Sequence, residues 1–106
     1  MKYIKKFEKK IDLPDVGDYV LMNSYGIPKV VEFITNNYGI FINSYVDKLS
    51  VKQKIIVRYE NIPGDIDLFF HDGTRTFDLD LLVSYGSTIE ELKMRIESNK
   101  FNLWNI

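Results

Sequence analysis

The single histidine of this 106-residue chain, His71, stands next to Asp72 and is the first candidate for chemistry. A lone imidazole can act as a general base, and a neighbouring carboxylate can orient it. Both residues, however, belong to a His-Asp-Gly-Thr segment at 71–74 that is typical of a tight turn, and neighbours on a hairpin strand point to opposite faces. We therefore interpret His71 as an exposed turn residue.

Aspartates later in the chain are the second candidate. Asp65, Asp67 and Asp72 could offer the oxygen ligands that calcium and magnesium prefer, but their spacing is not that of a calcium-binding loop. We interpret them as solvated carboxylates of turns and strands. Asp78 and Asp80 are expected on one strand face about 7 Å apart, which would suit a glycosidase-like site, yet no second constellation supports one.

Other catalytic and cofactor-binding signatures are missing from the sequence. There is no cysteine, which excludes a disulfide framework, a thiolate zinc site and a cysteine nucleophile. The chain also lacks a glycine-rich phosphate loop and a nucleotide-binding fingerprint. We therefore expect a protein that is not an enzyme and uses no cofactor and no metal. An enzyme of unknown class, relying on His71 or Asp78, is the third of three functional alternatives.

The elements that would position these groups are mainly strands. Apolar and polar residues alternate in 54–60 and again in 77–81, as in strands with one buried face. Asp72-Gly73 between apolar segments predicts a type I′ hairpin turn. An earlier strand is expected at 17–22. A second hairpin is expected around the Asn-Asn-Tyr-Gly segment at 36–39, joining strands at 29–35 and 38–44.

One helix is predicted at 87–99. Ser87 followed by Glu90 has the spacing of a capping box, and Asn99 is expected to end the helix. Apolar residues recur at helical spacing on one face at Ile89, Leu92 and Ile96. The apolar tail at 100–106 is expected to fold back onto the sheet, with docking onto a partner as the alternative.

These elements predict a mainly β (α+β) fold, because antiparallel strands precede a terminal helix without βαβ alternation. We expect a small SH3-like antiparallel barrel or bent sheet of five to six strands with a C-terminal α-helix; an open α+β sheet is the alternative. No linker-like stretch divides the chain. A single domain, 1–106, is therefore expected, with a basic N-terminal segment at 1–12, the sheet or barrel at 17–83, the helix at 87–99 and the tail at 100–106.

Charge and hydropathy predict a soluble, cytoplasmic protein without a membrane partner. No apolar run approaches the roughly 20 residues of a membrane span, and the start lacks the apolar core of a secretory signal. The net charge is only −1, but residues 1–10 hold five lysines against Glu8, whereas residues 60–80 hold six acidic residues against Arg75. Solvated strand faces account for this pattern, and an acidic face for a basic partner is the functional alternative.

Tyrosines and aspartates in the connections are the candidate anchors for a protein partner, because interfaces favour tyrosine and loops commonly carry recognition. The long connection at 43–50 is the first choice of binding element. The candidate partner-binding residues are Tyr25, Tyr45, Asp47, Asp65, Asp67, Asp72 and Tyr85. The alternative is a single-stranded nucleic-acid-binding module that uses the basic N-terminus and the aromatic side chains of Tyr3, Phe7, Tyr25, Tyr38 and Tyr45.

Several short motifs resemble those of known small proteins. Val16–Leu21 (VGDYVL) is similar to the opening strand of SH3-like barrels. Tyr59–Pro63, Ser87–Leu92 and Lys100–Asn102 extend the resemblance to small SH3-like-barrel accessory proteins of phages and mobile elements of low-GC Gram-positive bacteria. The chain departs from them at 38–54, where it carries extra residues, and no functional residue carries over.

This resemblance implies a protein that works by binding in the cytoplasm of a bacterial host, and some such proteins block CRISPR–Cas complexes. We therefore expect a non-catalytic phage-type protein that occludes a surface of a bacterial host protein or protein complex. Its most concrete form is an anti-CRISPR-like inhibitor of a defence system. The sequence leaves the partner and the oligomeric state open.

Overall fold

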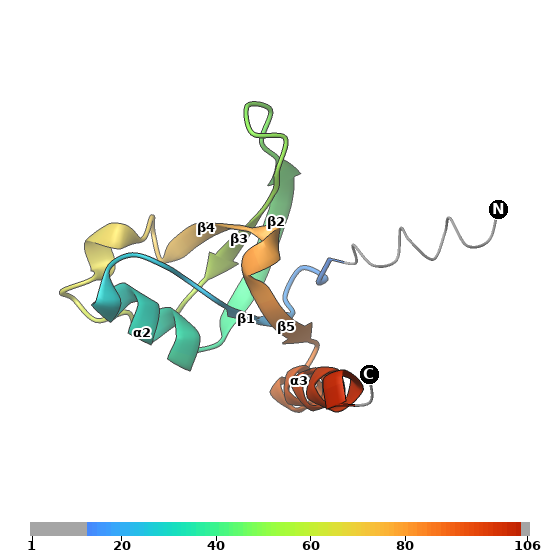
Figure 1. Cartoon of the computed structure of the whole chain (residues 1–106). Coiled ribbons are helices and arrows are strands. Elements are labelled where there is room, and N and C mark those ends of the chain that lie inside the picture. Colours follow the sequence, from blue (N-terminus) through green and yellow to red (C-terminus); the bar gives the residue numbers. More distant parts are fainter. Residues whose placement is uncertain (1–12, 105–106) are drawn as a thin grey trace.

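The computed structural model describes the backbone of residues 13–104 and the side chains of residues 13–98. This part of the chain forms one sheet, two α-helices and two short 3₁₀ helices (Figure 1). In chain order the elements are β1 (Tyr19–Met22), α2 (Pro28–Asn36), β2 (Gly39–Val46), β3 (Gln53–Arg58), η1 (Asp67–Phe69), β4 (Thr74–Asp78), η2 (Leu79–Leu81), β5 (Leu82–Gly86) and α3 (Ile89–Trp104).

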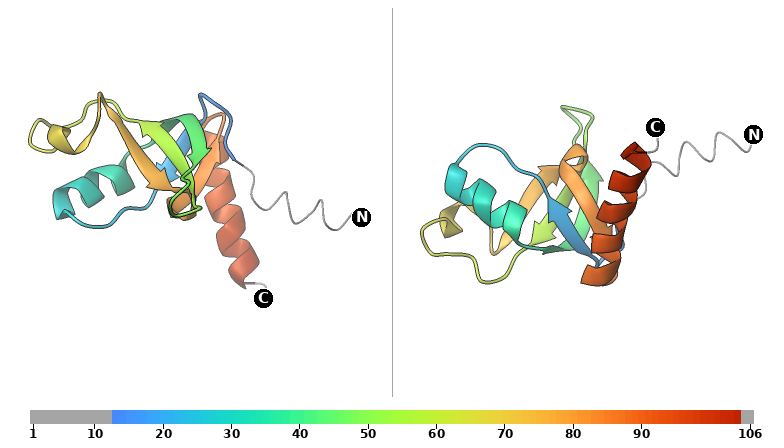
Figure 2. Two further views of the ribbon diagram at one scale, coloured as in Figure 1. Left: turned by 90° about the horizontal axis from the view of Figure 1, so that it is seen from above. Right: turned by 60° about the horizontal axis from the view of Figure 1, so that its bottom comes forward.

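The sheet is antiparallel, has the strand order β4-β3-β2-β1-β5 and is strongly curled. Its two edge strands, β4 and β5, are joined only by η2. The edges of a flat five-stranded sheet lie about 19 Å apart, whereas the four steps from Asp78 to Leu82 reach at most about 14 Å. The edges must therefore approach each other, and Figure 2 shows this curvature.

The predicted mainly β fold with a C-terminal helix is confirmed, with five antiparallel strands. The SH3-like barrel is not confirmed, because β4 and β5 do not pair and the sheet stays open between them. The predicted turn is also present. Asp72 and Gly73 have φ angles of 50° and 79°, and His71 and Thr74 exchange two backbone hydrogen bonds of 2.8 Å.

The predicted strand at 29–35 is wrong, since these residues belong to α2. The segment is rich in β-branched residues, which favour strands. Nevertheless Pro28 occupies the first turn, where its fixed φ suits a helix, and Val30 and Ile34, four residues apart, both bury against the sheet. The predicted hairpin at 36–39 is therefore wrong as well: Asn37 caps the helix end, and its side-chain amide donates to the carbonyl of Phe33 at 2.7 Å.

The segment at 77–81 is a strand only as far as Asp78. Leu79–Leu81 forms η2, which turns the chain toward the opposite edge of the sheet, and β5 then continues to Gly86 rather than ending at residue 83. Asp80 consequently lies outside β4, so Asp78 and Asp80 do not share a strand face.

The core lies between the concave face of the sheet, α2 and the 59–70 segment. The predicted inward residues Ile55, Val57 and Phe77 are buried. Behind them Tyr59 packs edge-to-face against Phe33, with ring centroids 5.7 Å apart. The complete buried cluster is Val20, Met22, Val30, Ile34, Phe41, Ile55, Val57, Tyr59, Ile66, Phe70 and Phe77.

The terminal helix α3 packs on β5 (Figure 2). Leu92 is fully buried and its carbonyl accepts a 2.8 Å hydrogen bond from the Ser84 hydroxyl. Two predicted details are wrong. Thr88, not Ser87, caps the helix, because its hydroxyl accepts from the Glu91 amide at 3.1 Å. The helix also runs through residue 99 to residue 104, so most of the expected tail is helical backbone.

Candidate functional site

A projecting hairpin is the most unusual surface feature of the fold. We define the hairpin arm as residues 43–54, comprising the distal half of β2, the connection and the start of β3. β1 pairs with β2 only at Gly39 and Ile40, whereas the pairing of β2 with β3 continues out to Val46 and Gln53. The arm therefore extends as a two-stranded ribbon beyond β1, and Figure 1 shows its tip standing clear of the rest of the molecule.

Hydrogen bonds hold the tip of the arm in one shape. The Asp47 amide donates to the Lys52 carbonyl at 2.9 Å, and the Val51 amide donates to the Asp47 carbonyl at 2.7 Å. The Ser50 hydroxyl donates to the Asp47 carboxylate at 2.7 Å, and this bond is the main cause that lowers the pKa of Asp47. The tip is therefore preorganised although it is exposed.

The tip displays apolar side chains beside the exposed polar side chains of Lys48 and Ser50. Leu49 is 95% exposed and Val51 is 78% exposed, and the neighbouring Tyr45 and Val46 are exposed too. Scattered exposed apolar residues are ordinary, but four on one projecting hairpin are typical of an interaction surface.

Val51 also has a strained backbone, with a φ of 58°. A β-branched residue is a genuine outlier in this region, because its side chain crowds the backbone. Such strain costs on the order of 1–3 kcal/mol and clusters at functional sites. Glycine or asparagine would adopt this φ without strain, yet the residue here is an exposed valine. Val51 is therefore a candidate contact for a partner.

Lysines and one aspartate flank the base of the arm. Asp78, at the end of β4, forms ion pairs with Lys54 and, at 3.5 Å, with Lys52. The hydrogen bond from Lys54 is the main cause that lowers the pKa of Asp78. These contacts brace the arm against β4. They also pair two of the arm's three lysines, Lys52 and Lys54, with a carboxylate.

The structure separates the predicted partner-binding residues into different regions. Tyr45 and Asp47 lie on the arm. The acidic residues Asp65, Asp67 and Asp72 lie instead around η1 and the following turn, well away from the tip (Figure 1). The remaining two predicted residues are elsewhere. Tyr25 is exposed in the β1–α2 connection, and Tyr85 is half-buried on β5 with the Arg95 guanidinium 4.5 Å from its ring centroid.

Sequence reasoning missed Leu49 and Val51, although the signal was present. Two apolar residues inside a connection otherwise made of Asp, Lys and Ser are unexpected, because a surface turn has no core to bury them in. The residues predicted in this connection, Tyr45 and Asp47, lie on the arm, but they do not include its two most exposed apolar side chains.

The groups considered for catalysis are dispersed. His71 and Asp72 have side chains that are each 94% exposed, with 3.9 Å between Nε2 and Oδ2, as expected for a turn. Asp65 is paired with Lys29 at 2.9 Å. Within the described part of the chain, no three His, Cys, Asp or Glu side chains gather where they could hold a metal ion.

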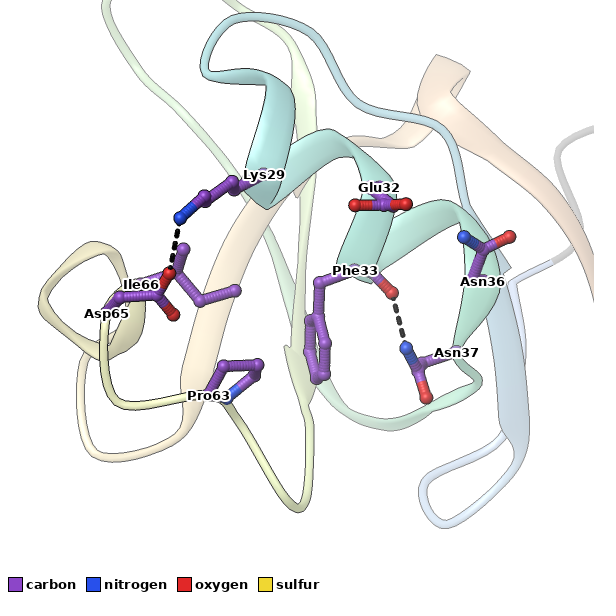
Figure 3. A pocket seen from close by; sticks show the side chains of 8 residues that line it. All are labelled: Lys29, Glu32, Phe33, Asn36, Asn37, Pro63, Asp65 and Ile66. Carbon is purple, nitrogen blue, oxygen red and sulfur yellow. Dashed lines mark hydrogen bonds and ion pairs between the residues drawn. The ribbon is translucent and has the colours of Figure 1, made fainter.

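A separate cleft of about 400 Å³ lies between α2 and the loop before η1 (Figure 3). Phe33 forms its floor, and Pro63 and Ile66 line the opposite wall. The eight lining residues are Lys29, Glu32, Phe33, Asn36, Asn37, Pro63, Asp65 and Ile66. It shares no residue with the hairpin arm.

In comparisons with known proteins, no protein family, no curated protein and no solved structure matched the chain. Within residues 13–104 no helix has the length and apolar character needed to cross a bilayer. The fold and the surface together define a small mainly β domain with a projecting, hydrogen-bonded hairpin arm that exposes four large apolar side chains.

Proposed function

We propose that this chain is a non-catalytic protein-binding module that recognises its partner through the hairpin arm. The observation that carries the proposal is the rigid display of Leu49 and Val51 at a tip with no packing role in the described fold. Each such side chain contributes about 1.5–3 kcal/mol when it is transferred from water into an apolar pocket. Because the tip is already ordered, little of that gain is lost to ordering entropy.

The arm is suited to insertion into a groove of a larger protein. It is narrow, projects from the sheet and carries Leu49 at its tip with 95% of the residue exposed, so a partner pocket can surround Leu49 on several sides. Tyr45 and Val46, lower on the same arm, would form the rim of that contact. A hairpin inserted in this way can block a surface by occupying it, without any chemistry.

The specific form of the proposal comes from the sequence resemblance. We favour a phage-type inhibitor, acting in the bacterial cytoplasm, that occludes a host defence protein in the manner of an anti-CRISPR protein. The curled sheet, whose edge strands are joined by one 3₁₀ turn, supports an SH3-like barrel as the fold type. The hairpin arm falls within 38–54, the region in which the chain departs from the proteins it resembles.

The test is capture from nuclease-treated lysate of a low-GC Gram-positive bacterium, comparing wild type with Leu49→Asp. The matched control is Leu68→Asp, because Leu68 is 76% exposed and lies on η1, away from the arm. Wild type and Leu68→Asp are expected to retain the same stoichiometric protein, and Leu49→Asp to lose it. Circular dichroism is expected to show all three folded alike.

Two outcomes would overturn the proposal. Equal capture by Leu49→Asp would show that the arm is not the contact. Capture that disappears on nuclease treatment, with affinity falling steeply as salt rises, would instead indicate nucleic-acid binding, in which phosphate contacts release counterions.

A further inference from the structure

The cleft between α2 and the 63–66 loop has a chemistry different from that of the arm. Its apolar surface comes from Phe33, Pro63 and Ile66. Phe33 is held in place from behind, because its ring packs edge-to-face on Tyr59 and on Phe70 at 5.7 and 5.9 Å. The aromatic floor is thus part of the core, and Figure 3 shows it between Pro63 and Asn37.

Two side chains that line the cleft, Glu32 and Asn37, have oxygen acceptors that no residue within 13–98 engages. Glu32 has no ion pair within residues 13–98, since the neighbouring Lys29 is engaged with Asp65 at 2.9 Å. Asn37 uses its amide nitrogen on the Phe33 carbonyl, which leaves its side-chain oxygen as an acceptor. The only cation lining the cleft is therefore already committed, whereas carboxylate and amide oxygens remain available.

The end of α2 adds negative potential at the same place. Asn36 and Asn37 mark the C-terminus of the helix, where carbonyl groups carry the negative end of the helix dipole. The last turn of α2 contains no basic residue to compensate it. The helix end, the Glu32 carboxylate and the Phe33 ring all line this cleft, and each of them favours a cation.

From these observations we infer that the cleft is a socket for an arginine side chain displayed by a partner polypeptide. A guanidinium offers five N–H donors to a site that holds mainly acceptors, and its plane can stack on Phe33. The three methylenes of arginine would lie along Pro63 and Ile66, as amphipathic side chains do on apolar surface. This second contact is independent of the hairpin arm.

The experiment is an NMR titration of the isotope-labelled full chain with acetyl-Gly-Arg-Gly-amide. We expect saturable shifts of the amides of residues 32–37 and 64–66, with a Kd on the order of 1 mM. The same peptide with citrulline in place of arginine, which has the same shape without charge, is expected to give no saturable shift. Guanidinium ion without the aliphatic stem is expected to bind at least about tenfold more weakly.

Variants separate this site from a nonspecific charge effect. Glu32→Gln is expected to weaken binding about tenfold, the size of one charge-assisted hydrogen bond. Glu97→Gln, at an exposed position of α3, is the matched control and is expected to leave the Kd unchanged. Equal shifts with the citrulline peptide, equal binding of bare guanidinium, or an unchanged Kd in Glu32→Gln would each overturn the inference, whatever the arm binds.

Discussion

At the scale of single residues, Val51 combines a strained backbone with an exposed apolar side chain. Among residues 13–104, three non-glycine residues have positive φ: Val51, Asn61 and Asp72. Asparagine and aspartate tolerate this region because their short polar side chains can bond locally, whereas valine does not. The side chain that causes this strain projects into solvent. In the isolated domain, therefore, no packing contact of this side chain offsets the free-energy cost of the strain.

The strain at Val51 predicts that Val51→Asn stabilises the isolated domain. Relief of the left-handed strain is expected to raise the free energy of unfolding by about 1 kcal/mol. Capture of the partner is expected to weaken in the same variant, because an apolar contact is lost. Urea denaturation of wild type and variant measures the first effect, and a lower midpoint for Val51→Asn would contradict the strain argument.

Tyr59 presents the opposite situation, a polar atom in the core. Its hydroxyl is buried without a hydrogen-bond partner among residues 13–98, and burial raises its pKa above the ordinary value of 10.0. An unsatisfied buried hydroxyl carries a desolvation cost that no bond offsets. Tyr59→Phe is therefore expected to leave stability unchanged or raise it by about 1 kcal/mol. A loss above that size in thermal or urea unfolding would show that the hydroxyl has an unrecognised partner.

At the scale of elements, the two helices show what a sequence pattern can and cannot predict. The register of α3 was predictable, because Ile89, Leu92 and Ile96 recur at helical spacing among polar residues. That residues 28–36 form a helix could not be predicted. Val, Ile and Thr favour strands locally, and only burial of Val30 and Ile34 against the sheet favours the helix. Tertiary packing overrode local preference there.

The docking of α3 on β5 depends on Gly86. A Cβ at this position would lie 2.7 Å from the backbone nitrogen of Leu92. Gly86→Ala is therefore expected to destabilise the domain by about 1–3 kcal/mol, since backbone atoms must shift. Gly64→Ala is the control, because a Cβ there meets nothing within 4 Å and the φ is ordinary; it is expected to be neutral or slightly stabilising. Equal stability of both variants would contradict the packing of α3.

At the scale of the whole molecule, the ion pairs predict a pH dependence of stability. Asp78 and Asp65 have pKa values lowered by their hydrogen bonds with Lys54 and Lys29. Their stabilisation is complete above the ordinary aspartate pKa of 3.8 and is lost as pH falls through the lowered values. The two lysines have raised pKa values, so their contribution is complete below the ordinary 10.5 and is lost as pH rises through the raised values.

Unfolding is thus expected to be hardest on a broad plateau between about pH 5 and pH 10 and to become easier on both sides. Asp78→Asn is expected to make the acid limb shallower, because it removes the carboxylate shared by Lys52 and Lys54. Denaturation midpoints of wild type and Asp78→Asn, measured from below about pH 5 to above about pH 10, test this prediction. An acid limb of unchanged slope in Asp78→Asn would show that the brace at the base of the arm contributes nothing.

The overall architecture could be predicted only in outline. Alternating segments and the Asp72-Gly73 turn predict antiparallel strands, but β1 pairs with β2 about 20 positions away and with β5 at least 60 positions away. No local pattern specifies such contacts, or the open seam between β4 and β5. The candidate site was predicted as a segment, 43–50, while its tip residues depended on exposures that only the folded chain defines.

The most direct test of the central claim is site-specific photo-crosslinking in a low-GC Gram-positive host. A photo-reactive amino acid is placed at position 49 in one strain and, as control, at position 68 in another. If the hairpin arm is the recognition surface, position 49 gives one discrete protein adduct and position 68 gives none. No adduct from position 49, or the same adduct from both positions, would contradict it.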